Sequence, residues 1–136
     1  TEITDDFITQ MLSRARDYSI VILKAGPNRS RPGAEKMIWE HARSNFLLRA
    51  NGLLPIVCPI TDGGDLAGVG IFNADVDEVK SIMDQDPAVK EGVLVYEAIP
   101  AGAFPELPAG EEIGDENSGK ERADPSRYYG LLKGDP

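Results

Sequence analysis

The apolar pattern of this chain predicts an α+β fold with the order strand, helix, strand, strand, helix, strand. Two observations predict it. Apolar residues recur at helical spacing over residues 34–50 and from Val76 to Met83, as is typical of helices that pack one face on a core. Short runs rich in β-branched residues, typical of strands, occupy residues 18–24, 53–60, 66–73 and 93–99.

Helix signals mark the ends of the predicted elements. Residues 4–16 predict an additional N-terminal helix, with Thr4 as its N-cap. Residues 25–33 are rich in Gly and Pro and predict a loop after the first strand. The last helix has Asp75 as its expected N-cap, and Asp86-Pro87 ends it because the residue before proline avoids the helical region.

The order of these elements is the split βαβ, ferredoxin-like arrangement. It has a four-stranded antiparallel sheet with two helices on one face. Residues 18–24 and 93–99 are apolar on both sides, so the other face also needs a cover. We expect a second copy of the chain to provide it, in an isologous homodimer with sheet against sheet.

Two regions follow from composition. We expect residues 1–103 to form a single α+β domain that includes the N-terminal helix. Residues 104–136 contain eight acidic and four basic residues and are rich in Gly and Pro. Such a segment buries too little apolar surface to fold by itself. We expect an extended tail, ordered only where Tyr128–Leu132 docks.

Composition excludes several classes of function. The formal charge of −9 argues against a nucleic-acid partner, which needs cations against phosphates. The apolar runs are far shorter than the ~20 residues that span a bilayer, and no basic-led secretory signal starts the sequence, so we expect a cytoplasmic protein without membrane contact. One cysteine and one histidine exclude disulfides and multi-histidine metal sites within the chain. No nucleotide motif is present, and we expect no cofactor and no metal.

Two motifs stand out in the middle of the chain. The predicted first core helix carries His41 within Glu40–Arg43, and Asp86-Pro87 precedes Gly92 and the last strand. With these motifs, residues 18–103 resemble the YciI-like (YCII-related) family of dimeric α+β barrel proteins. The resemblance implies that His41 and Asp86 lie together in a cleft. The chain departs from the family at Cys58-Pro59, where Gly-Pro is usual, and in the segments outside residues 18–103.

His41 and Asp86 together suit general acid/base chemistry. A neutral imidazole accepts and returns a proton near neutral pH, and a carboxylate on its other nitrogen holds the tautomer. The competing interpretation is structural: His41 packs against the sheet edge, and Asp86 only ends its helix.

Other side chains are candidates for binding. Arg29 and Arg31 lie in the loop after the first strand and could bind a carboxylate or phenolate of a substrate, or simply be solvated. Tyr96, on the last strand, is a further substrate-binding candidate. Cys58 is a potential nucleophile, but we expect it to be buried, inert packing.

The sequence therefore supports two functional hypotheses. The first is a small cofactor-independent enzyme, a lyase, isomerase or dehydrohalogenase, that transfers protons on a small organic substrate. The resemblance to dimeric α+β barrels, which often act on breakdown products of aromatic compounds, suggests that substrate class. The alternative is a non-catalytic metabolite-binding or accessory module that acts through the cleft or the acidic tail.

Overall fold

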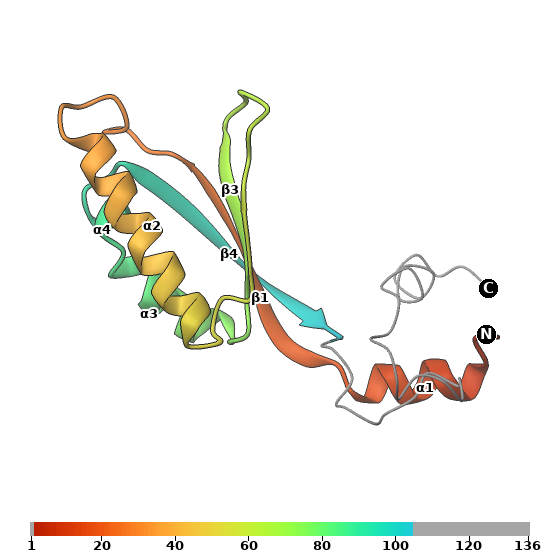
Figure 1. The fold of residues 1–136 in the computed structure, drawn as a ribbon. Helices are drawn as coiled ribbons and strands as arrows, with labels where there is room; N and C mark the ends of the chain where they lie inside the picture. The colour runs from red at the N-terminus through yellow and green to blue at the C-terminus, as the bar shows by residue number, and fades with distance from the viewer. Residues whose placement is uncertain (1, 105–136) are drawn as a thin grey trace. The chain divides into compact units, whose positions relative to one another are not determined.

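A computed structural model describes residues 2–104 of the chain. The structure divides into two compact units, one formed by Asp17–Gly102 and the other including the N-terminal segment up to Arg16 (Figure 1). The tail predicted over residues 104–136 lies, apart from Phe104, outside the described residues. The prediction that residues 1–103 form one domain stays a prediction.

Helix α1 (Asp5–Ser13) lies in the N-terminal segment. Its N-cap is Thr4, as predicted, and the Thr4 hydroxyl accepts a hydrogen bond from the backbone N–H of Phe7 at 3.1 Å. The helix ends three residues before the predicted boundary at residue 16, because the backbone is already extended in strand β1 at Arg16.

The larger unit contains a four-stranded sheet in the order β2-β3-β1-β4. Strand β3 pairs antiparallel with both β1 and β2, and the strand order is that of the predicted ferredoxin-like fold. The strand bounds are β1 (Arg16–Ala25), β2 (Ile56–Pro59), β3 (Leu66–Phe72) and β4 (Leu94–Ala103).

Strand β2 is shorter than the predicted range of residues 53–60. The N–H groups of Leu53 and Leu54 both donate to the carbonyl of Leu48, at 3.0 and 3.3 Å. These two residues therefore complete the end of the preceding helix, and Leu54 is buried in the core.

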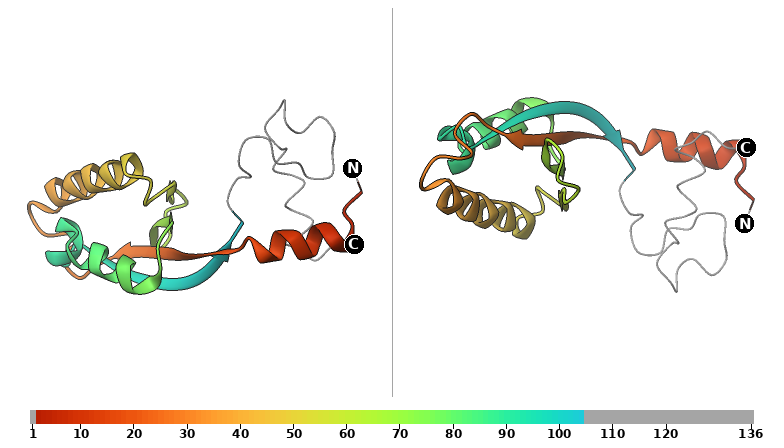
Figure 2. Two further views of the ribbon diagram at one scale, coloured as in Figure 1. Left: turned by 90° about the horizontal axis from the view of Figure 1, so that it is seen from below. Right: turned by 90° about the horizontal axis from the view of Figure 1, so that it is seen from above.

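Three helices accompany the sheet in this unit: α2 (Ala34–Ala50), α3 (Val76–Asp84) and α4 (Pro87–Lys90). Helix α4 contacts both α2 and α3 (Figure 2). Asp75 caps α3 as predicted, accepting from the N–H of Glu78 at 2.9 Å. The sequence did not predict α4. Asp86-Pro87 ends α3, but it also begins α4, with Asp86 as N-cap and proline at the first turn, where a missing N–H costs nothing.

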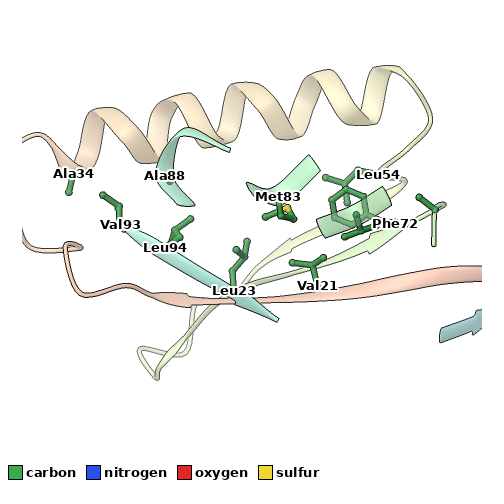
Figure 3. Close-up of a cluster of buried hydrophobic side chains, with 11 residues drawn as sticks. Val21, Leu23, Ala34, Leu54, Phe72, Met83, Ala88, Val93 and Leu94 are labelled. Atoms are coloured by element: carbon green, nitrogen blue, oxygen red, sulfur yellow. The ribbon is translucent and has the colours of Figure 1, made fainter. Parts of the chain in front are cut away.

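The core lies between the helices and one face of the sheet (Figure 3). Val21 and Leu23 project from β1, Phe72 from β3, and Val79 and Met83 from α3. Along β1 the buried side chains alternate with half-buried ones, because successive strand residues point to opposite faces.

Candidate functional site

The structure brings His41 and Asp86 together, 45 residues apart in sequence. His41 Nδ1 and Asp86 Oδ1 are 2.8 Å apart, and the two residues are only 8% and 6% exposed. The second carboxylate oxygen, Oδ2, accepts hydrogen bonds from the backbone N–H groups of Ala88 and Val89 at 3.0 and 3.2 Å. Asp86 is thus held by helix α4 and aimed at the imidazole of His41 on helix α2.

The other ring nitrogen of His41 also has a partner. The side-chain amide Nδ2 of Asn45 lies 3.2 Å from His41 Nε2. A carboxylate only accepts, and an amide N–H only donates, so with the Asn45 amide in this orientation the contacts match the imidazole tautomer that carries its proton on Nδ1 and a lone pair on Nε2. Sequence reasoning missed Asn45, although its i+4 spacing from His41 puts both side chains on one face of α2.

His41 and Asn45 open onto a cavity of about 430 Å³ between helix α2 and the sheet. This volume lies in the range of small-molecule sites. The cavity has mostly apolar walls. Among the described residues that line it, the charged or titratable ones are His41, Arg29 and Cys58. Its apolar lining residues include Val21, Leu23, Ile38, Ala42, Leu54 and Val57.

A docked loop brings Arg29 to this cavity. The Gly26 N–H donates to the carbonyl of Val93 at 2.8 Å, and the Asn28 N–H donates to the carbonyl of Gly92 at 2.9 Å. A Cβ on residue 26 would lie 2.3 Å from the Gly92 carbonyl oxygen, so only glycine allows this approach. The Arg29 guanidinium is partly exposed and pairs with Glu35 at 2.8 Å.

The other two predicted binding residues do not line the cavity. Arg31 lies in the same loop as Arg29. The Tyr96 hydroxyl donates to Asp84 Oδ1 at 2.7 Å. Burial raises the pKa of Tyr96 to about 12, and the hydrogen bond and negative charge of Asp84 act in the same direction. Tyr96 therefore links β4 to the end of α3.

Cys58 is exposed, and the expectation that it is buried packing was wrong. It lies on β2, which pairs with β3 alone among the strands of residues 2–104 and forms one edge of their sheet. It is also among the residues that border the cavity.

Two further findings concern residues 2–104, the part of the chain that the structure describes. Within residues 2–104, no cluster of three or more His, Cys, Asp or Glu side chains is arranged to hold a metal ion. None of the helices in this range has the length and hydropathy needed to cross a membrane.

No protein-family model and no curated protein matches the chain. Among solved structures, the chain is similar to 5-chloro-2-hydroxyhydroquinone dehydrochlorinase from Burkholderia phenoliruptrix, solved with 2,5-dihydroxybenzoquinone. The identity is 22%, the match covers 59% of this chain and 90% of the other, and the TM-score is 0.42. At this level the similarity carries no conclusion about activity. The ferredoxin-like fold rests on the strand order and pairing described above.

Proposed function

We propose that this chain is a small cofactor-independent enzyme that transfers protons on a small organic molecule, as a lyase, isomerase or dehydrohalogenase. One observation carries the proposal: the hydrogen-bonded pair of His41 and Asp86 is buried, yet His41 lines a cavity large enough for a ligand. A histidine whose only role was packing would have no such cavity beside it.

In the proposed reaction, His41 Nε2 accepts a proton from a C–H or O–H group of the substrate. The imidazolium that forms keeps its Nδ1–H on Asp86, whose negative charge stabilises it. In an isomerisation, His41 returns the proton to another substrate atom. In an elimination, the electron pair of the broken C–H bond forms a double bond as the leaving group departs, and His41 then releases the proton to that group or to water.

The position of Arg29 at the cavity favours a substrate that carries a negative charge. Its guanidinium is the cationic group at the cavity besides the titratable His41. A guanidinium binds carboxylates and phenolates through several N–H donors. In Arg29 the Nη1 group donates to the Glu35 carboxylate. The resemblance of residues 18–103 to YciI-like proteins makes acidic products of aromatic breakdown the first compounds to test.

The experiment compares the full-length chain with its His41→Gln variant on a panel of substituted phenols, hydroquinones and benzoates. Solvent deuterium uptake and halide release are followed by NMR and ion chromatography. Glutamine keeps polar atoms in the cavity but cannot exchange a proton, so the rate should fall at least ~100-fold. A turnover that His41→Gln leaves unchanged would exclude His41 as the acid/base.

A second candidate function is a binding module for the same class of metabolite. The observation that favours it is the bond between Asn45 and His41 Nε2, since an occupied lone pair is no base. Turnover by the wild type separates the two functions, and the variant Asn45→Ala tests whether the amide of Asn45 keeps substrate from His41 Nε2. If His41 is the base, the variant keeps turnover, because the substrate replaces the amide at Nε2. If the protein only binds, wild type and variant are equally inactive and differ only in affinity.

A further inference from the structure

We propose that Gly68 determines which ligands the cavity accepts, by leaving a flat strip of backbone as its floor, and that this floor takes a planar ring bearing one anionic group. The inference deepens the proposed function, since it concerns the ligand of the same cavity. The inference requires that the cavity binds a ligand. It does not require that His41 takes part in catalysis.

The floor of the cavity is formed by strand β3, which lies between β2 and β1 in the sheet. On β3, Gly68 and Gly70 occupy two successive positions on the face toward the core, followed by the buried Phe72. Gly68 pairs with Leu23 on β1 and with Pro59 on β2. All four of the residues Gly68, Gly70, Leu23 and Pro59 line the cavity. Side chains therefore border this part of the floor on both flanking strands and are missing between them.

The two glycines differ in what their missing side chains leave room for. A Cβ at Gly70 would lie 3.1 Å from Leu54 Cδ1 and 3.5 Å from Phe72 Cε2. The space above Gly70 is therefore already filled by the core. At Gly68 the nearest side-chain atom is Leu23 Cδ1 at 3.9 Å, and the closest atom is the backbone carbonyl oxygen of Cys58 at 3.3 Å. Gly68 thus leaves space in the cavity, whereas Gly70 leaves space for Leu54.

The chemistry of the walls indicates the ligand. A strand backbone without side chains presents a flat surface, and Ile38 and Ala42 of α2 border the same cavity with apolar groups. A planar ring can place more of its atoms against the bare backbone at Gly68 than a puckered ring of the same size can. Arg29 and His41 border the cavity as its cationic and titratable groups, which favours a single negative charge on the ligand.

The test uses benzoate and cyclohexanecarboxylate as probes, because they share charge and carbon number and differ in ring planarity. His41 is the only histidine of the chain, so one set of imidazole NMR signals in the full-length protein reports binding. We expect wild type to bind benzoate at least fivefold more tightly than cyclohexanecarboxylate. Gly68→Ala should weaken benzoate binding at least fivefold, and Gly68→Val should weaken it further.

Gly102→Ala on β4 is the matched control, since a Cβ there meets nothing within 4 Å. It should bind both probes as wild type does. Thermal unfolding of each variant shows whether lost binding is lost folding. A Cβ at residue 68 would lie 3.3 Å from the Cys58 carbonyl oxygen, so β2 must shift slightly in both variants, and Gly68→Ala, with a single added methyl group, provides the milder test.

Three results would overturn the inference: equal binding of the two probes, benzoate binding that Gly68→Ala leaves unchanged, or no binding of either probe to wild type. The outcome is separable from that of the proposed function. If benzoate binds in the Gly68-dependent way and no compound of the panel shows His41-dependent turnover, the floor assignment stands and the enzyme proposal fails. If turnover depends on His41 and Gly68→Ala changes nothing, the reverse holds.

Discussion

Asp86 makes hydrogen bonds with both of its carboxylate oxygens. Oδ1 faces His41 Nδ1, and Oδ2 caps helix α4 through the N–H groups of Ala88 and Val89. Asp86 therefore positions the imidazole of His41 and also caps helix α4. The first turn of α4 in turn fixes the Asp86 carboxylate.

Substitutions at Asp86 should separate these two contributions. Asp86→Ala loses the cap, about 1 kcal/mol, and leaves buried polar partners unsatisfied, about 1–3 kcal/mol more. Asp86→Asn keeps a capping oxygen and should cost less. Both variants lose the negative charge beside Nδ1, so both should turn over substrate at least ~100-fold more slowly. Chemical denaturation and initial rates measure the two effects.

Asp75→Ala is the control for capping alone. Asp75 caps α3 in the same way, accepting from the N–H of Glu78, and it is absent from the cavity lining. It should destabilise the fold by about 1 kcal/mol and leave turnover unchanged. If Asp86→Asn matched wild type in rate, Asp86 would be only a cap.

At this scale the sequence predicted part of the site. The resemblance implied the meeting of His41 and Asp86, and the structure places them in hydrogen-bond contact. Arg29 borders the cavity, whereas Arg31 and Tyr96 do not. A loop or strand residue has no periodicity that shows its direction relative to a distant element. Its position depends on contacts such as Gly26 with Gly92, which only the folded chain makes.

At the scale of elements, Tyr96 links strand β4 to helix α3. Its hydroxyl donates to Asp84 at the last position of α3 and approaches the carbonyl of Lys80 at 3.4 Å. The link holds only while the phenol is protonated, because a phenolate cannot donate and would face the negative charge of Asp84. The stability of this junction therefore depends on pH.

The raised pKa of Tyr96 gives the sign of that dependence. The value is about 12 in the folded chain against 10.0 for an ordinary tyrosine. The stabilisation is thus complete below pH 10.0 and is lost as the pH rises toward about 12. In a difference titration of tyrosinate absorbance between wild type and Tyr96→Phe, the signal of Tyr96 should appear near pH 12 and not near pH 10.0.

The expected companion effect is on unfolding. Stability of the wild type should fall more steeply above pH 10.0 than that of Tyr96→Phe. Asp84→Asn removes the neighbouring charge and keeps an acceptor, so Tyr96 should titrate earlier in that variant. A Tyr96 that ionises near the ordinary tyrosine pKa of 10.0 would show that the link does not form.

Element boundaries show how far local signals reach. Capping predicted the first residues of α1 and α3, because an N-cap bonds within its own first turn. Helix α4 was missed, because Asp86-Pro87 has the same local signature at the end of one helix and at the start of another. The length of β2 depended on Leu54 turning into the core, a long-range contact.

At the scale of the whole molecule, one face of the sheet has no helix over it within Asp17–Gly102. Half-buried apolar residues on this face include Ile20 and Ile22 of β1, while Ile56 of β2 and Val95 of β4 are 51% and 44% exposed. Strands with apolar residues on both sides need a cover on both faces. The homodimer stays a prediction, and this face is the surface that it would bury.

Light scattering coupled to size exclusion tests the homodimer. We expect wild type at twice the 14.7 kDa mass of one chain. Val95→Lys places a charge on the face to be buried and should yield monomers. Leu47→Lys is the control, since Leu47 is 62% exposed on helix α2, away from the sheet. Wild type that elutes as a monomer at micromolar concentration would exclude the dimer.

The sequence by itself determined the order of the strands and of the two longer core helices, the N-caps of α1 and α3 and the ferredoxin-like fold, because periodicity, capping and turn propensity act over a few neighbouring residues. Only the tertiary structure decided that the Asn45 amide contacts His41 Nε2 and that Arg29 borders the cavity. It also decided that Gly68 and Gly70 have different neighbours. These features depend on side chains brought together from separate elements. Their distances are set by the packing of the helices on the sheet, which no local pattern encodes.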